Sequence, residues 1–523
     1  MPPVDLFPLF LPLTLVIAGA LIVLGFEPFL QRASKHRLLP WLAAILLVAA
    51  GAVQAGAPTG SLHGIFAMDT PRLWMCEAII ISTLIAIGGL QMSLARDDYP
   101  GGEAYSLSLF GAAGAMLMVM AVDTLALFVA LELMSLSIYA LVGMRRNRRE
   151  SNEALFKYFV MGAVFSAIFL YGAALSYGAT GSTAFGHPWR DEAHRGLFLF
   201  GQVLMLIGLL FKVGVVPFHF WTADAYTGAP VAVTGFMGAV VKVGGFAAIG
   251  TLWLNLAAVA SGMPIPGVLD LGAAVTLNQT GKDLLAHYNL AFLVLGLLSL
   301  VLGNFSALKQ TSIRRIIAFS SISHAGYMLL ALALPIGEKL QLGSLWFYVV
   351  GYAIATAGAL SAFTALAGKE DINDNLSGIA GQGRARPFYG LLLTIFLVSI
   401  AGVPPTVGFL GKYLIFQDLV VRGDVKIAIF AMIMAVVGAA YYFRTLVAVW
   451  AAPSCEPAKA GPPVLSGWVL AGAAVLTLVL IGWPNALIRP DPAGAANLGL
   501  SAPAAPAAEQ AVLPTGLATA ATR

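Results

Sequence analysis

Long runs of apolar residues recur along the chain, and they constrain the fold more than any other feature of the sequence. A membrane-spanning helix needs about 20 mainly apolar residues. Fourteen runs meet this requirement, and they begin near Leu6, Leu39, Cys76, Tyr105, Thr124, Ala154, Leu197, Pro230, Tyr288, Ser312, Ser344, Pro387, Lys426 and Gly467. The runs are too long for barrel strands, and a helix satisfies its own backbone hydrogen bonds in lipid. The sequence therefore predicts an all-α polytopic membrane protein with about 14 transmembrane helices.

The composition agrees with a lipid environment and excludes several functions. Charged residues make up 10% of the 523 residues, whereas soluble domains carry about 25%. The net charge of +4 comes without a basic block, so nucleic-acid binding is not expected. Cys76 and Cys455 form no CxxC motif or Cys/His set, so neither an iron–sulfur cluster nor structural zinc is expected. No Lys or Arg and no clear cleavage site accompany the first apolar run, which favours a retained span over a signal peptide.

The distribution of basic residues between the loops predicts an orientation. The loops after odd-numbered spans hold fifteen Lys and Arg residues, and the other side, with both termini, holds nine. Basic residues favour the cytoplasmic side. We therefore expect both termini on the periplasmic side of a bacterial inner membrane. The basic residues at 145–149 are expected to anchor a cytoplasmic loop rather than to form a binding site.

Two stretches interrupt apolar runs with proline, and they divide the chain into repeats. "LFKVGVVPFHFW", residues 210–221, contains Pro217, and "SIAGVPPTVGFLGKY", residues 399–413, contains Pro404 and Pro405. These breaks fall in spans 7 and 12, the fourth of five crossings in spans 4–8 and in spans 9–13. Because five is odd, the second set is expected to be inverted relative to the first. Matched interruptions in inverted repeats indicate a transport pathway, although proline is also common in membrane helices.

We expect six segments along the chain. They are an N-terminal three-helix segment (1–104), a first five-helix repeat (105–254), a connecting loop (255–287), a second, inverted five-helix repeat (288–450), a final helix (451–489) and a disordered Ala/Pro-rich tail (490–523).

A few charged residues lie inside the apolar runs, where a charge at the bilayer centre costs about 2.5 to 3.5 kcal/mol. They are Lys157, Lys212, Lys242, Lys412, Arg444 and Glu132. Arg444 lies near the end of its span and is expected to reach the interface. The others either form structural ion pairs or handle protons. Glu132 is the only acid squarely inside a span, so Lys212 is its expected partner.

The functional interpretation of these charges is proton transfer. A lysine paired with a carboxylate holds its proton and tends to release it when the carboxylate moves away. Imidazole titrates near neutral pH, so His219 and His324 are candidate relays between the lysines. Either histidine can equally be a packed, hydrogen-bonded core residue.

Several longer motifs carry a resemblance to a known family. "LELMSLSIYAL", "EALFKYFVMGAVFSAIFLYG", "FKVGVVPFHFWTADAYTGAPVAVTGF" and "IAGVPPTVGFLGKY" resemble the proton-pumping, antiporter-like membrane subunits of bacterial respiratory complex I, the type I NADH:quinone oxidoreductase. The resemblance extends from about residue 105 to residue 450.

The N-type subunit, called subunit 2 in mitochondria, is the most similar member. The YTGAP motif at residues 226–230, Lys412 in place of the glutamate usual in the M type, and the lack of a long lateral helix after span 14 favour it. Two features depart from the family pattern. The family often has Pro and Glu where this chain has Ala223 and Thr227, and the connection after Asn255 is unusually long.

The resemblance implies a proton pathway and a set of partners. The implied pathway residues are Glu132, Lys157, Lys212, His219, Lys242, His324 and Lys412, with helix breaks at Pro217, Pro404 and Pro405. NADH, FMN, iron–sulfur clusters and quinone belong to other subunits, and this chain binds no cofactor or metal and has no catalytic residue of its own. Its partners are other complex I membrane subunits, including neighbouring antiporter-like subunits. Two alternatives stay open: a subunit of a multisubunit cation/proton antiporter, and a structural membrane scaffold whose charges only pair.

Overall fold

The computed structural model describes residues 6–62, 64–262, 271, 275–333, 339–340, 342–451 and 464–482. The tail expected at 490–523 and Cys455 lie outside these residues.

The described part of the chain is built from helices. Their bounds are α1 (Leu6–Phe26), α2 (Arg32–Gln54), α3 (Thr70–Asp97), α4 (Glu103–Met120), α5 (Thr124–Val142), α6 (Arg149–Thr180), α7 (Glu192–Val213), α8 (Thr222–Gly228), α9 (Val231–Phe236), a π-helical turn η2 (Met237–Val241), α10 (Lys242–Ala260), α11 (Gln279–Lys309), α12 (Ile313–Leu332), α13 (Gly343–Leu366), α14 (Gln382–Ala385), α15 (Pro387–Ala401), α16 (Val407–Val421), α17 (Val425–Ala451) and α18 (Val464–Val479). Short 3-10 turns lie at Glu27–Phe29 (η1), Lys369–Asp371 (η3) and Leu480–Gly482 (η4).

The predicted all-α membrane fold is confirmed. Thirteen helices among the described residues are long and apolar enough to cross a membrane, with α9, η2 and α10 forming one of them. The remaining predicted span corresponds to two shorter helices, α15 and α16, on either side of a break.

Both predicted interruptions are breaks between helices. Between α7 and α8, Gly214 adopts a left-handed conformation (φ +70°), and Pro217 lies in the same interval. Between α15 and α16, Gly402 (φ +86°) likewise ends the first helix, ahead of Pro404 and Pro405. A positive φ is accessible to glycine at little cost, so each glycine allows the chain to leave its helix abruptly. The inversion of one repeat relative to the other stays a prediction.

The connection between the expected repeats contains less loop than the sequence indicates. Helix α10 continues to Ala260 and α11 begins at Gln279, both inside the interval 255–287. Between them, β3 (Val275–Thr276) pairs antiparallel with β4 (Lys339–Leu340). A second small hairpin joins β1 (Gly60–Leu62) and β2 (Phe66–Met68).

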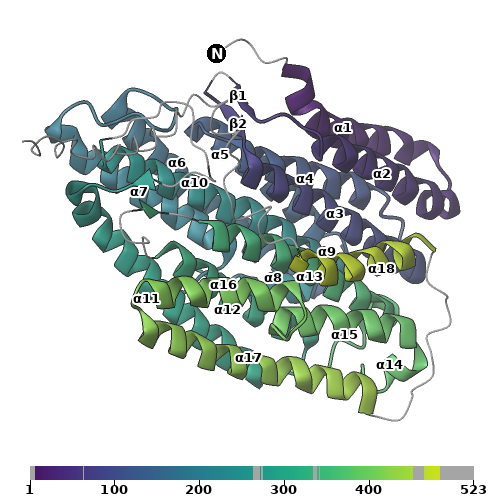
Figure 1. Ribbon diagram of the computed structural model, residues 1–523. Coiled ribbons are helices and arrows are strands. Elements are labelled where there is room, and N and C mark those ends of the chain that lie inside the picture. Colours follow the sequence, from purple (N-terminus) through teal and green to yellow (C-terminus); the bar gives the residue numbers. More distant parts are fainter. Residues whose placement is uncertain are drawn as a thin grey trace, which may run out of the picture.

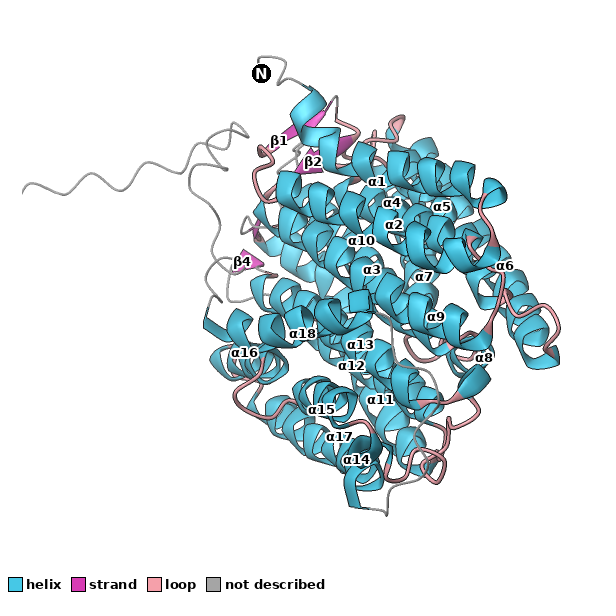
Figure 2. Ribbon diagram, turned by 90° about the vertical axis from the view of Figure 1, so that its right-hand side faces the viewer, coloured by secondary structure: helices cyan, strands magenta, loops and turns pink. Residues whose placement is uncertain are grey.

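Two spans form the centre of the bundle. The continuous helix Val231–Ala260 and α13 are buried by other helices along their whole apolar windows. Figure 1 shows α1 and α2 at one edge and α14 and α17 at the opposite edge, and Figure 2 shows the same arrangement from the side. Helices far apart in sequence meet in the centre: α3 and α18 both pack on α13. The buried charged residues therefore lie in a protein interior rather than in lipid.

Candidate functional site

Lys212 is held in an aromatic and hydroxyl environment at the end of α7. Its ammonium group donates a hydrogen bond to Ser135 Oγ of α5 (2.8 Å). It also lies over the rings of Tyr139 (5.2 Å) and Tyr158 (5.1 Å). A cation over an aromatic face is stabilised by the ring quadrupole. Because Lys212 lies in the last turn of α7, the negative end of the helix dipole also favours its charge.

Glu132 lies on the same helix as Ser135 but does not pair with Lys212. Its carboxylate accepts a hydrogen bond from Ser166 Oγ of α6. Among the described residues, the ion pairs include none between Glu132 and Lys212, so the expected direct contact is not made in this structure. Each charge is instead bonded to a serine, and a small cavity lies between α5, α6 and α7. Its lining consists of Leu131, Tyr139, Gly162, Phe165, Ser166, Gly208, Phe211 and Lys212.

His219 lies in the break that follows α7 and is half-buried. Its Nδ1 atom is buried and has no hydrogen-bond partner in the structure. The backbone around it is fixed, because Thr222 N–H donates to the His219 carbonyl (3.0 Å) and Trp221 Nε1 donates to the Phe211 carbonyl (2.9 Å). A buried ring nitrogen without a partner is available to a water or to a moving proton.

Lys242 connects the central helix to α12. It follows directly after the π-helical turn, a distortion often found at functional sites. The side chain is 3% exposed, and its Nζ donates to the backbone carbonyl of Ser321 (2.6 Å). Tyr226 Oη and Ser321 Oγ lie 3.5 Å apart, which places a second hydroxyl pair beside this contact.

His324 lies one turn further along α12 and is bonded through both ring nitrogens. Nδ1 lies 2.6 Å from Tyr348 Oη, and Nε2 lies 3.1 Å from Tyr442 Oη. Tyr442 Oη is in turn hydrogen bonded to Ser320 Oγ. Hydrogen-bonded hydroxyls can both donate and accept, so this histidine is part of a polar network and is not an isolated core residue.

Lys412 lies after the second break and points back to the helix that precedes it. Its Nζ donates to the carbonyls of Ile400 (3.1 Å) and Ala401 (2.7 Å), in the last turn of α15. It also lies over the Tyr327 ring at 5.5 Å. At both breaks, therefore, an ammonium group lies at the C-terminal end of a half-helix, where unpaired carbonyls favour a cation.

Lys157 differs from the other lysines because it is exposed. Its side chain is 40% accessible, and its Nζ pairs with Glu153 (2.7 Å) and Asp224 (2.9 Å). Arg444 is also exposed, and it donates to the carbonyls at the end of α11, at Leu308 and Gln310. Lys157 and Arg444 are thus exposed charged groups with hydrogen-bond or ion-pair partners at the edge of the helix bundle. Neither belongs to the buried row of Lys212, Lys242 and Lys412.

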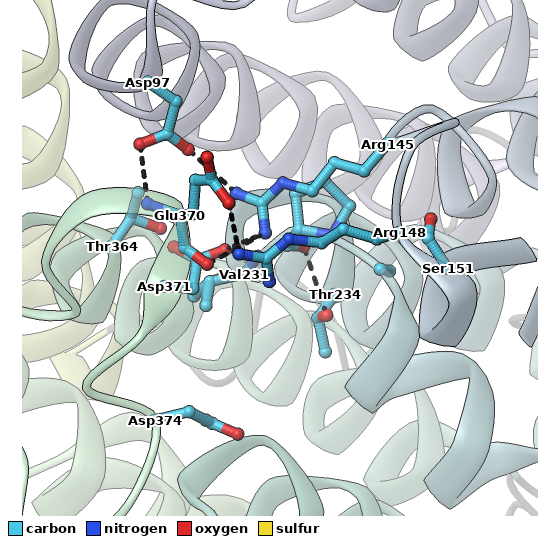
Figure 3. Close-up of polar contacts among 12 residues, drawn as sticks. Asp97, Arg145, Arg148, Ser151, Val231, Thr234, Thr364, Glu370, Asp371 and Asp374 are labelled. Carbon is cyan, nitrogen blue, oxygen red and sulfur yellow. Dashed lines mark hydrogen bonds and ion pairs between the residues drawn. The ribbon is translucent and has the colours of Figure 1, made fainter.

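An ion-pair cluster lies at one end of the bundle. Its members are Arg96, Asp97, Arg145, Arg148, Arg314, Glu370, Asp371 and Asp374. Figure 3 shows Asp97, Arg145, Arg148, Glu370 and Asp371 pointing toward one another. Arg145 and Arg148, from the basic stretch 145–149, both contact carboxylates of this cluster. The expectation that this stretch anchors a cytoplasmic loop stays a prediction.

The cluster perturbs the titration of two carboxyl groups outside the spans. Burial raises the pKa of the Asp371 carboxyl, but the guanidinium groups of Arg145, Arg96 and Arg314 outweigh burial and hold this pKa below its ordinary value. The hydrogen bond and charge of Arg148 lower the pKa of the exposed Glu370 carboxyl. Both carboxyl groups are therefore ionised at neutral pH.

Sequence reasoning missed one acid near the start of a span and several residues of the site. Glu77, in the second turn of α3, is that acid, and it is partly buried. The tyrosines and serines that contact the charged groups were not expected either: Ser135, Tyr139, Tyr158, Ser166, Tyr348 and Tyr442. Hydroxyl residues are frequent in membrane helices, so only the three-dimensional contacts distinguish these. Within the described residues, no group of His, Cys, Asp and Glu is placed to hold a metal ion.

Comparisons with known proteins agree with one another. A family model described as NADH:quinone oxidoreductase/Mrp antiporter, TM, matches residues 121–280 and 252–438. NADH-quinone oxidoreductase subunit N of Trichlorobacter lovleyi is 34% identical over 426 residues, which cover 80% of this chain and 82% of that protein.

Solved structures show the same relationship. A chain of respiratory complex I from Thermus thermophilus, with bound aureothin, has a TM-score of 0.72 and 31% identity, covering 91% of this chain and 97% of that one. A chain of the Mrp complex from Dietzia sp. shares the fold, with a TM-score of 0.73 and 20% identity. The match covers 94% of this chain and 99% of that one. The chain belongs to the NADH-quinone oxidoreductase subunit N family, the multi-pass, antiporter-like membrane subunits of complex I.

Proposed function

We propose that this chain translocates protons as a non-redox membrane subunit of NADH:quinone oxidoreductase. Electron transfer from NADH to quinone takes place in other subunits, which hold FMN, the iron–sulfur clusters and the quinone. This chain contributes a proton path through Glu132, Lys212, Lys242, His324 and Lys412.

The observation that carries the proposal is the buried row of three ammonium groups, which are bonded to a serine hydroxyl and to backbone carbonyls. Lys212, Lys242 and Lys412 are 3%, 3% and 6% exposed, and no carboxylate is paired with any of them among the described residues. A buried charge without a counter-ion is costly. The retention of such a charge at three places in the chain is explained when each group can lose and regain a proton.

The path begins and ends at groups near the helix breaks. His219, with an unpartnered Nδ1, lies beside the first break and is proposed to exchange protons with Lys212 through water. Lys157, in its exposed group with Glu153 and Asp224, is proposed to serve at the entrance of the path rather than within it.

The orientation and the partners are part of the same proposal. The end of the bundle that holds the ion-pair cluster faces the cytoplasm, because basic residues concentrate in its loops. Both termini then lie in the periplasm. The chain assembles with neighbouring antiporter-like subunits, and it binds no cofactor itself.

The proposal is tested in inverted membrane vesicles that oxidise NADH. Lys212→Ala and Glu132→Ala are compared with wild type for the amount of assembled complex, NADH:quinone turnover and proton uptake. Lys426→Ala is the matched control, because Lys426 is an exposed lysine. Turnover and proton uptake per assembled complex are expected to fall together in the first two variants and to stay normal in the control. Normal pumping in all three variants contradicts the proposal and favours a scaffold with structural charges.

A cation/proton antiporter subunit is the second candidate, because a chain of the Mrp complex shares the fold. Such a subunit exchanges cations without redox chemistry. If the chain co-purifies with proteins that carry no iron–sulfur cluster, and vesicles that contain it exchange Na⁺ for protons without NADH, this second function is correct.

A further inference from the structure

One short segment, residues 371–374, holds the first turns of both helices that meet at Lys242 and Ser321. Lys242 belongs to the continuous helix Val231–Ala260, and Ser321 belongs to α12. Both helices begin at the ion-pair cluster, which lies just after the end of α13.

Asp371 anchors the helix that carries Lys242. Its Oδ2 atom accepts a hydrogen bond from the backbone N–H of Val231 (3.2 Å), the first residue of that helix. The carboxylate also pairs with Arg96 (2.9 Å) and Arg145 (2.8 Å). Its side chain is 0% exposed. With two arginines and one N–H bonded to it, this carboxylate cannot move without leaving a buried charge unpaired.

Asp374, three residues later, anchors α12. Its carbonyl accepts from Ile313 N–H (2.7 Å), and its carboxylate accepts from Arg314 N–H (3.1 Å) and Ser312 Oγ (2.5 Å). Arg314 then crosses to the other helix, because its Nη1 donates to the carbonyl of Ala229 (2.8 Å), just before Val231. The starts of the two helices are thus bonded to one another as well as to the same segment.

This common anchor determines where Lys242 meets α12. At 1.5 Å rise per residue, Lys242 lies about 17 Å along its helix from Val231, and Ser321 lies about 12 Å along α12 from Ile313. Because both helices are bonded to the same segment at their first turns, a shift at these anchored ends changes the position of the Lys242 ammonium relative to the Ser321 carbonyl and to His324, one turn further on.

We propose that Asp371 and Asp374 are positioning residues for proton transfer between the two halves of the chain, holding Lys242 in register with α12. This inference rests on the proposed proton path. Neither carboxylate carries a proton along that path, because both are held by arginines at the end of the bundle.

The alternative is that the cluster only stabilises the folded chain. Six of its members are buried or partly buried, and they comprise three positive and three negative charges: Arg96, Arg145, Arg314, Asp97, Asp371 and Asp374. A purely structural role lowers the amount of assembled complex and leaves each assembled complex fully active. A positioning role lowers the turnover of each complex.

The test uses the whole complex in inverted vesicles with Asp371→Asn, Asp374→Asn and the control Glu370→Gln. Glu370→Gln removes the same charge one residue from Asp371, but among the described residues the Glu370 carboxylate pairs with Arg148 alone and with neither helix. Assembled complex, turnover at saturating NADH and quinone, KM for quinone, and proton uptake are measured for each.

Positioning predicts that turnover and proton uptake per assembled complex fall about tenfold in Asp371→Asn and Asp374→Asn, because small misplacements of reacting groups are costly. KM for quinone is unchanged, and the control behaves as wild type. Full turnover per complex in both aspartate variants overturns the inference. Failure of both variants to assemble also overturns it, because the cluster is then required for folding alone.

A fourth variant separates this inference from the proposed function. Lys242→Met is measured in the same vesicles. If it pumps normally, the proton path itself is wrong. If it loses pumping while Asp371→Asn and Asp374→Asn retain it, the path stands and only the positioning role is contradicted.

Discussion

The Lys242 ammonium donates a hydrogen bond to the backbone carbonyl of Ser321 at 2.6 Å, and this contact joins the two halves of the chain. A backbone carbonyl accepts a hydrogen bond but does not relay a proton. Onward transfer from Lys242 therefore passes to side chains of α12 or to water. His324, bonded to two tyrosine hydroxyls, is the nearest titratable group along that helix.

Removal of the Ser135 hydroxyl tests the environment of Lys212. Ser135→Ala deletes the acceptor that lies 2.8 Å from the ammonium. A hydrogen bond to a charged group contributes about 1.5 to 3 kcal/mol, so we expect turnover per complex to fall about tenfold. Ser137→Ala is the control, because the Ser137 hydroxyl donates only to the Leu133 carbonyl of its own helix. Equal turnover in the two variants contradicts a role for this contact.

The tyrosine beside His324 is tested by Tyr348→Phe. This change keeps the ring that stacks on His324 and removes the hydroxyl 2.6 Å from Nδ1. A neutral hydrogen bond contributes about 1 kcal/mol, so proton uptake is expected to fall about fivefold. Tyr105→Phe serves as the comparison, since the buried Tyr105 hydroxyl has no hydrogen-bond partner among the described residues. Its loss is expected to leave uptake unchanged. If Tyr348→Phe pumps as well as Tyr105→Phe, the hydroxyl is not part of the path.

The space for the Lys412 side chain depends on Gly402. A Cβ atom at this glycine, whose φ is +86°, meets Lys412 Cδ at 2.9 Å and Nζ at 3.1 Å. Gly423 has a similar φ of +90° and nothing within 4 Å of the added atom. We expect Gly402→Ala and Gly423→Ala each to cost roughly 1–2 kcal/mol of stability from the left-handed backbone.

Only Gly402→Ala is expected to lower turnover per complex, because the displaced ammonium loses its contact with the Ala401 carbonyl. Thermal unfolding in detergent measures the backbone strain, and NADH:quinone turnover measures the displacement. Equal turnover in both variants indicates that the position of Lys412 does not limit the reaction.

The ion-pair cluster predicts a pH dependence of stability. The pKa of Asp371 in the folded chain is below its ordinary value of about 4. Its contribution to stability is therefore complete above about pH 4 and is lost as the pH falls through the lowered pKa. The difference in unfolding temperature between wild type and Asp371→Asn is expected to be constant from pH 5 to 8 and to shrink in more acidic buffer. A difference that grows as the pH falls has the wrong sign for this account.

Much of the helical fold could be predicted because lipid imposes long apolar runs on the sequence. Each predicted span has a counterpart in the described structure, and both breaks lie where proline and glycine interrupt a run, around Pro217 and Pro404. The residues at which individual helices end were less predictable. Helix α10 extends to Ala260 because its last turns are packed inside the bundle, which residue composition alone does not reveal.

The site was predictable as a set of charges but not as a set of contacts. Lys212, Lys242 and Lys412 stand out because charge is rare in apolar runs, and all three are buried. Their partners are a serine hydroxyl and backbone carbonyls, and Lys212 lacks the carboxylate partner expected for it, because contacts between spans depend on helix rotation and register. Glu77 was missed because it lies near the start of its run.

The most direct test of the central claim is the simultaneous measurement of NADH oxidation and proton uptake in inverted vesicles containing Lys242→Met. Lys426→Met is the matched control on the exposed surface. The account predicts fully assembled complex in both, with oxidation and uptake per complex reduced together at least about tenfold in Lys242→Met only. Wild-type oxidation with wild-type proton uptake in Lys242→Met would show that the buried lysine row carries no protons.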